Sequence, residues 1–364
     1  EATPLLSAPD RLRPDLAGAA RPEPGPWTPG EPPLDGAVFI GVVDDAPCFA
    51  HERLRDAAGR TRVDFLWLQD APWAPGGGDP PFGRALLRPE IDAMLDAGRM
   101  AGGAVDEDGV YRAAGLIDMA APQPQSAARG FCHGAAVADI AGGGRGLPGF
   151  PLALVGLPAA VIADTSGAFA APYVAAGVAR ILDHVARRGR EAGRTYHAVV
   201  TISLGLTGGP KDGAGALETA LDRLASATRE GLGRVEIVLP TGNHRQSRTR
   251  ARMAPGAGPL FWRLAPDDRT PSFLEVWGPH RGKAPSAAGF TLGLGAPGWP
   301  APAPAAFAGF GETQDLRDGD GRLLARLWTQ WRADPRGGGR AVLTLAAPPT
   351  RPAAPDGAWV TPGD

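Results

Sequence analysis

Short runs of continuous apolar residues alternate with helical patterns over the first two thirds of the chain. Three runs rich in β-branched residues lie at 38–43, 199–204 and 235–239. Two stripes of apolar residues recur at helical spacing between them: Val174, Val178, Ile181 and Val185, then Leu217, Leu221 and Leu224. Because a continuous apolar run suits a strand covered on both faces, this alternation predicts an α/β fold, a parallel sheet flanked by helices.

The pattern changes after about residue 255, where short strand candidates replace the helical spacing. The candidates are 261–264, 273–277, 290–294, 323–331 and 341–345, with Pro/Gly-rich turns between them. They predict an antiparallel β-sandwich or jelly-roll-like module. We therefore expect a Pro-rich N-terminal arm over 1–35, an α/β domain over 36–250 and a β module over 251–364.

The composition is that of a globular protein with many loops. Hydrophobic residues make up 43% and charged residues 21%, while Gly and Pro number 52 and 39. The formal net charge of −2, with no basic cluster, argues against a nucleic-acid partner. No apolar run reaches the roughly 18 residues of a membrane span. The two cysteines, Cys48 and Cys132, leave both a single bridge and two reduced thiols open.

Three polar residues adjoin the predicted elements. Asp44 ends the first strand run, at the edge where parallel sheets gather functional groups. His133 opens a small-residue segment that predicts a closely packed helix, able to hold an imidazole as a general base. Asn243 follows the third run, where its amide could donate to an oxyanion. Each residue alone is better explained as a turn, cap or structural side chain. Their order and strand context together indicate a catalytic site.

These motifs resemble those of the subtilisin-like serine peptidase (subtilase) family. The matching segments are 40–45 (the strand ending in the catalytic Asp), 51–54 (His-Pro-Asp-Leu), 133–142 (the His-Gly-Thr-His-Val-Ala-Gly helix), 202–205 (Ser-Leu-Gly) and 241–243 (Ala-Gly-Asn). The resemblance covers about 36–245 and implies a subtilisin-like sheet. It also implies that Asp44 orients His133, that His133 is the general base and that Asn243 stabilises the oxyanion. The residues expected to bind the peptide as an added strand are Ser203, Leu204 and Gly205.

The chain departs from the family pattern at several positions. Ala46 replaces a Gly, Ala136 replaces the second His of the helix motif, and Asp139 replaces another Gly. The long separation of Asp44 from His133 implies a large insertion at about 56–120.

The serine motif of the family, Gly-Thr-Ser-x-Ala-x-Pro, is not found between residues 244 and 364. A segment around Ser166 resembles it superficially, but it precedes the Ser-Leu-Gly strand, and Pro172 lies too far from the serine. A strand end at 160–163, a loop and a helix with Pro172 in its first turn explain that segment better. The nucleophile is therefore unknown, and we expect it beyond Asp364.

The resemblance implies an N-terminal part of a serine endopeptidase, which hydrolyses peptide bonds with an Asp-His-Ser triad. Without the nucleophile, only about 10³–10⁴-fold catalysis over water typically remains. One alternative is an inactive subtilase-like scaffold that acts as a protein-interaction module. Another is a carbohydrate- or protein-binding β module on an α/β body, with an accidental likeness to the triad.

The expected partners are a peptide or protein substrate and a complementary C-terminal fragment that carries the serine, with no nucleic acid and no membrane. No cofactor is required. Calcium could be a structural ion, but the acidic loop 315–321 lacks the closing Glu of a helix–loop–helix site, which favours a surface turn. The family resemblance favours a secreted or periplasmic protein, although the sequence contains no leader.

Overall fold

The computed structural model describes most of the chain beyond residue 37. The described residues are 38–73, 80–122, 124–144, 149–164, 169–243, 247–254, 257–285, 292–293, 304–305, 309–334, 337–352, 357 and 359–361. The chain divides into two units, 1–37 and 38–364. The expected Pro-rich arm at 1–35 and Ser166 lie outside the described residues.

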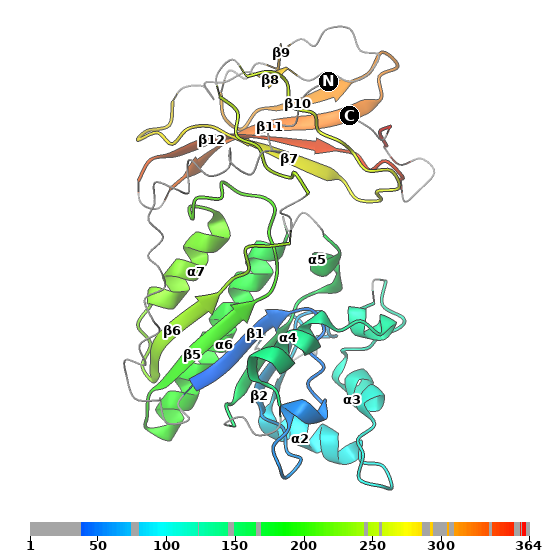
Figure 1. Cartoon of the computed structure of the whole chain (residues 1–364), viewed down its shortest axis with the longest axis vertical. Helices are drawn as coiled ribbons and strands as arrows, with labels where there is room; N and C mark the ends of the chain where they lie inside the picture. The colour runs from blue at the N-terminus through cyan, green and yellow to red at the C-terminus, as the bar shows by residue number, and fades with distance from the viewer. Residues whose placement is uncertain are drawn as a thin grey trace, which may run out of the picture. The chain divides into compact units, whose positions relative to one another are not determined.

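A six-stranded mixed sheet is the centre of the α/β part (Figure 1). Its strands, in sheet order, are β3 (Arg84–Leu87), β2 (Val63–Leu68), β4 (Leu152–Gly156), β1 (Val38–Asp44), β5 (Tyr196–Ile202) and β6 (Leu232–Val238). β2, β4, β1, β5 and β6 pair in parallel. β3 pairs with β2 in the antiparallel sense, so the sheet is mixed and not purely parallel as the sequence predicted.

Helices cover both faces of this sheet (Figure 1). The described helices of the α/β part are η2 (Glu52–Leu54), α2 (Arg88–Ala97), α3 (Glu107–Ala114), η3 (Ser126–Arg129), α4 (His133–Gly142), α5 (Ala159–Ala163), α6 (Ala170–Ala192) and α7 (Ala216–Ser226). Pro172 lies in the first turn of α6, as expected. The strand end expected at 160–163 is wrong, because those residues belong to α5.

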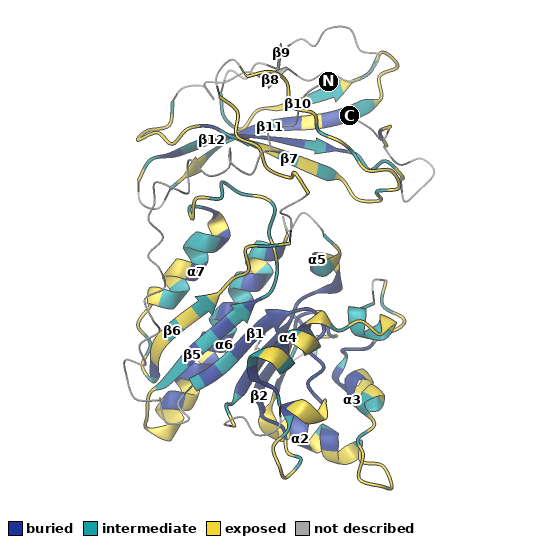
Figure 2. Cartoon of the chain, in the orientation of Figure 1, coloured by how far each residue is buried: buried dark blue, intermediate teal, exposed yellow. Residues whose placement is uncertain are grey.

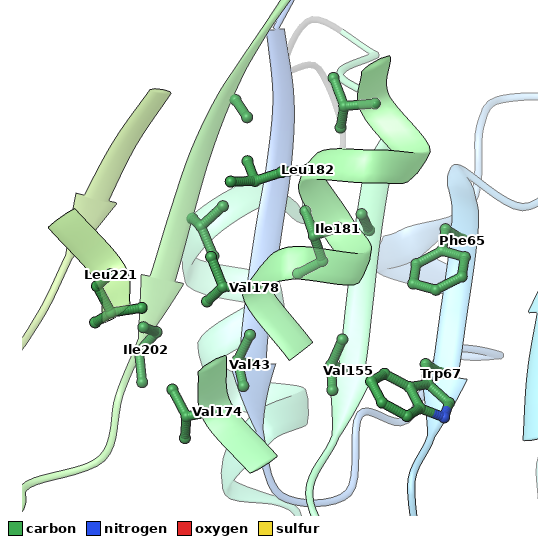
Figure 3. Close-up of a cluster of buried hydrophobic side chains, with 14 of the residues drawn as sticks. Val43, Phe65, Trp67, Val155, Val174, Val178, Ile181, Leu182, Ile202 and Leu221 are labelled. Carbon is green, nitrogen blue, oxygen red and sulfur yellow. The ribbon is translucent and has the colours of Figure 1, made fainter. Parts of the chain in front are cut away.

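Alternate residues of the strands enter two apolar clusters, one on each face of the sheet. On one face, strand residues such as Val43 and Val155 pack against Val178 and Ile181 of α6 (Figure 3). On the other, Val42 and its neighbours pack with residues of α2, α3 and α4. The central strands are accordingly buried along most of their length (Figure 2). Because β1 is buried on both faces, its sequence is a continuous run of apolar residues.

Two strands of this sheet were not predicted from the sequence. β2 lies within the stretch 56–120 that was expected to be an insertion, yet all six of its residues are buried. β4 is also buried throughout and lies between β2 and β1. Residues 56–120 therefore contribute a central strand as well as peripheral elements.

A separate antiparallel sheet forms from the C-terminal residues. Its order is β10 (Thr313–Arg317), β11 (Leu323–Ala333), β12 (Gly339–Ala347) and β7 (Ser272–Trp277). β8 (Leu292–Gly293) and β9 (Pro304–Ala305) form a two-stranded pair. The predicted strands 273–277, 323–331 and 341–345 lie within β7, β11 and β12. Residues 261–264 form no strand, and most of 290–294 lies outside the described residues.

One face of the antiparallel sheet carries a small core of its own. Its buried members are Ala325, Leu327, Leu343 and Leu345, from the two central strands. The sandwich or jelly-roll arrangement expected for this module stays a prediction. Among the described residues, no helix combines the length and apolar character needed to cross a bilayer.

Candidate functional site

The candidate site begins at the carboxyl end of β1, where Asp44 is the last residue of the strand and Asp45 follows it. Both are buried, and the side chain of Asp44 is only 1% exposed. The carbonyl of Asp44 accepts the backbone N–H of Leu157 at 2.8 Å, which ties the end of β1 to the segment after β4. Asp44 is therefore held by the sheet itself and not by a loose turn.

The start of α4 meets this strand end through Asp45. The backbone N–H of Gly134, in the first turn of α4, donates to Asp45 Oδ1 at 2.5 Å. The hydroxyl of Ser126 donates to the other oxygen, Oδ2, at 2.8 Å. Since the first N–H groups of a helix have no partner within the helix, Asp45 caps α4 from another element.

Gly134 allows this close approach. A Cβ at this position would lie 2.7 Å from the carbonyl oxygen of Asp45 and 3.1 Å from the Cβ of Asp44. Such distances are too short for an ordinary side chain next to a backbone atom. The glycine that follows the histidine is thus required by the packing of α4 on β1.

His133, the first residue of α4, lies against Asp44. Its Nδ1 is 2.8 Å from Asp44 Oδ1, which also accepts the backbone N–H of Asp45 at 2.7 Å. The imidazole is 58% exposed, in contrast to the buried carboxylate. Within the described residues, Nε2 has no hydrogen-bond partner. A buried carboxylate therefore orients an imidazole whose second nitrogen faces outward.

The electrostatics of this pair follow from its unequal burial. The hydrogen bond with Asp44 raises the pKa of His133 above its ordinary value, and partial burial of the ring opposes that rise. Burial raises the pKa of Asp44, against the opposing hydrogen bonds from His133 and from the N–H of Asp45. Asp44 Oδ2 is buried without a partner among the described residues. The pair therefore binds a proton more readily than either group does in water.

An ion pair joins the 51–54 element to α4. Nε of Arg53, in the 51–54 element, is 2.6 Å from Oδ1 of Asp139 on α4. His51 caps η2 by accepting the N–H of Arg53 at its Nδ1. Arg53 and Asp139 thus form a partly exposed ion pair that links η2 to α4, the helix that carries His133.

The remaining predicted residues follow neighbouring strands. Ser203 and Leu204 come directly after β5 and are half-buried, while Gly205 is exposed. Asn243 is exposed and lies a few residues after β6. β5 is the neighbour of β1 and β6 is the neighbour of β5, so all these residues follow adjacent parallel strands. Their assignment to substrate and oxyanion binding stays a prediction.

The carboxylates that could hold a cation are mostly engaged by protein donors. Ligand-type atoms of Asp44, Asp45 and His133 lie within 4.8 Å of one another. The hydrogen bonds described above account for three of the four carboxylate oxygens, so we interpret the group as a hydrogen-bonded unit.

The acidic loop at 315–321 is engaged by arginines. Asp315 pairs with Arg317 and Arg326, and Asp318 pairs with Arg322. This arrangement fits the surface-turn interpretation.

The sequence analysis missed three features of the site. Asp45 and Ser126 were not singled out, although Asp45 is adjacent to Asp44. A cavity of about 290 Å³ lies beside the turn that carries Ser126, and its lining includes Asp70, Asp118 and Gln125. Asp70 Oδ2 accepts hydrogen bonds from Gln125 Nε2 at 2.8 Å and from the N–H of Ala159 at 2.9 Å. Nothing in the local sequence pattern marks these residues, because the fold alone brings them together.

A second Asp–His pair lies elsewhere in the α/β part. His184 Nε2 of α6 is 2.8 Å from Asp64 Oδ2 of β2, and both side chains are more than nine-tenths buried. Nδ1 of the same imidazole is 3.0 Å from Nη2 of Arg187, and Arg188 Nε lies 3.0 Å from Asp64 Oδ2. Both ring nitrogens are occupied, so this pair is suited to holding α6 on the sheet.

Comparisons with known proteins add little to this geometry. No family model matches the chain, and no curated protein matches it. A solved structure of the CspB protease from Clostridium perfringens aligns with a TM-score of 0.49 and 14% identity. The alignment covers 90% of this chain and 57% of that one, so the chain spans less than two thirds of the length of that neighbour.

Proposed function

We propose that this chain is the Asp–His part of a serine endopeptidase of the subtilisin-like type. The observation that carries the proposal is the 2.8 Å contact between buried Asp44 and exposed His133 Nδ1. Asp44 holds the imidazole in one orientation and stabilises its cation, and His133 Nε2 is the atom that takes the proton from a serine hydroxyl. That serine attacks the peptide carbonyl, and the proton passes to the leaving amine.

The strand order supports the rest of the assignment. Ser203, Leu204 and Gly205 follow β5, next to β1, where an extended peptide could pair with the backbone. Asn243 follows β6 one strand further on and would donate its amide to the oxyanion. The nucleophile is proposed to come from a segment that carries the Gly-Thr-Ser-x-Ala-x-Pro motif.

A second candidate function is a non-catalytic scaffold that binds proteins. The observation that favours it is the lack of the serine motif between 244 and 364. Its Asp–His pair would then be structural, and no reagent that requires an activated serine would label the protein.

Fluorophosphonate labelling of the natural full-length protein separates the two candidates. We expect a single labelled serine and a loss of labelling rate in His133→Ala. Because an Asn in place of the triad Asp leaves the geometry but stabilises the wrong tautomer, Asp44→Asn should label on the order of 10⁴-fold more slowly. Asp139→Asn, on the same helix but without a contact to His133, is the matched control. Absence of labelling in a folded, intact protein would reject the serine endopeptidase proposal.

A further inference from the structure

The two cysteines of the chain lie beside the two residues of the candidate site. Cys48 follows Asp44 by four residues and is 8% exposed, in the apolar cluster beneath α4. Cys132 directly precedes His133, is the N-cap residue of α4 and packs against the same cluster. The contacts of Asp44 with His133 and of Asp45 with Gly134 hold these two segments together. The structure therefore brings together two thiols far apart in sequence.

The two thiols pack in the same apolar cluster and are chemically unequal. Both are free, and each shifts the pKa of the other. Donation from Cys48 lowers the pKa of the Cys132 thiol, which burial and the charge of Asp45 oppose. The hydrogen bond to Cys132, together with burial, raises the pKa of Cys48. Cys132 is partly exposed at a helix N-terminus, a position that favours a thiolate. Cys132 is thus placed to react first, and Cys48 to react second.

We propose that Cys48 and Cys132 are a redox-sensitive thiol pair, which a small disulfide oxidises to an intramolecular disulfide next to His133. The Cys132 thiolate attacks one sulfur of the small disulfide and forms a mixed disulfide, releasing one small thiolate. Cys48 then gives up its proton and attacks the sulfur of Cys132, releasing a second small thiol. Two protein thiols are oxidised and one small disulfide is reduced to two thiols, so electrons and protons balance. This chemistry does not require a serine nucleophile.

The bond would join the segment after β1 to the first turn of α4. Because His133 is the residue after Cys132, a covalent link at Cys132 would change the position of the imidazole relative to Asp44. The pair would therefore couple the oxidation state of the chain to the geometry of the candidate site.

Oxidised glutathione is the probe for a direct test. The folded, reduced chain is incubated with it, remaining thiols are blocked with iodoacetamide, and the intact mass and the peptide map are measured. We expect the loss of two hydrogens, no glutathione adduct, and a peptide that links Cys48 to Cys132. Persistence of two free thiols in the folded chain, or a disulfide that forms only in denaturant, would overturn the proposal.

Two variants test the order of the steps. Cys48→Ala, which keeps the buried site apolar, should accumulate glutathione on Cys132, because the mixed disulfide cannot be resolved. Cys132→Ser should leave Cys48 unmodified, because that thiol is buried. Equal modification of both variants would contradict the assignment, and the wild-type measurement decides the matter if either variant fails to fold. In the wild type, oxidation should shift the NMR signal of His133, and reduction should reverse the shift. A signal that stays in place would refute the coupling to the site.

Discussion

Asp45 accepts the backbone N–H of Gly134 at 2.5 Å, although 89 residues separate them. The same carboxylate holds Ser126 on its other side. Asp45 therefore fixes the start of α4 against the end of β1, and with it the position of His133 relative to Asp44. The residue next to the proposed catalytic acid thus caps the helix that carries the proposed base.

Replacement of Asp45 by Ala should weaken this junction. Loss of a helix cap typically costs ~1 kcal/mol, within a range of about 0.5–2 kcal/mol. Ser126→Ala removes only the second hydrogen bond, so it should cost less, about 0.5–1.5 kcal/mol. Urea denaturation of both variants measures the difference. Equal stability of Asp45→Ala and wild type would show that another group caps α4.

Gly134→Ala should destabilise the protein in spite of the high helix propensity of alanine. Within a helix, Gly to Ala ordinarily gains up to about 1 kcal/mol. The new Cβ would collide with the backbone of Asp45, and overpacking of this kind costs roughly 1–3 kcal/mol. Ala136→Gly, at an exposed position of the same helix, is the control and should lose only the propensity term. A more stable Gly134→Ala variant would mean that α4 can move away from β1 without cost.

The pKa of His133 should fall when Asp44 is replaced by Asn. The hydrogen bond with Asp44 raises this pKa in the folded chain, so the pair stabilises the fold below the ordinary histidine value, about 6.5, and loses that contribution as pH rises through the raised value. In Asp44→Asn, the stabilisation of the fold by protonated His133 should be smaller over the same pH range. Histidine-detected NMR titration reads the pKa directly, with Asp139→Asn as the unperturbed comparison. An unchanged titration would separate Asp44 from the electrostatics of His133.

Asp64→Asn should be among the most damaging single substitutions in the α/β part. Burial favours the neutral acid, but the hydrogen bond and charge of His184 and the charge of Arg188 hold the pKa of Asp64 below its ordinary value. The ionised carboxylate therefore stabilises the fold above the ordinary pKa of about 3.9, and this contribution is lost as pH falls through the depressed value.

At neutral pH, removal of one partner from such a buried pair costs about 3–5 kcal/mol. Asp183→Asn, which breaks the more exposed pair with Arg229, should cost under about 1 kcal/mol. Denaturation of both variants at pH 7 and at pH 3 tests the expectation. A penalty for Asp64→Asn that does not shrink in acid would point to lost packing in place of lost charge.

Arg53 and Asp139 should be coupled weakly in a double-mutant cycle. Both side chains are at least one third exposed, and exposed ion pairs typically contribute about 0.2–1 kcal/mol. The coupling should decrease in high salt because the charges are screened. A coupling of zero at low salt would show that the contact between Arg53 and Asp139 does not stabilise the junction of η2 with α4.

The elements that could be predicted from the sequence are those in which one hydrophobic pattern dominates. β1, β5 and β6 were predicted because strands covered on both faces have continuous apolar sequences. α6 was predicted because its apolar stripe is long. β2 was missed because Asp64 interrupts its run with a charge whose partner, His184, is 120 residues away. β4 was missed because its short run of small and apolar residues fits a helix equally well.

The candidate site was predicted only as far as local motifs reach. Asp44 and His133 were chosen by their position next to a strand and a helix, and the structure places them within hydrogen-bonding distance. The role of Asp45 was not predictable, since its partners Ser126 and Gly134 become neighbours only after the sheet has formed. The antiparallel direction of β3 is equally a property of the chain path and leaves no trace in its four residues.

Two Asp–His pairs with the same 2.8 Å contact, at Asp44 and at Asp64, have opposite access to water. At Asp44 the imidazole is open to solvent, whereas at Asp64 both nitrogens of His184 are engaged inside the protein. A reagent that modifies exposed imidazoles will therefore distinguish the two histidines by their accessibility. In one and the same chain, His133 is the exposed imidazole to be tested and His184 is the buried reference.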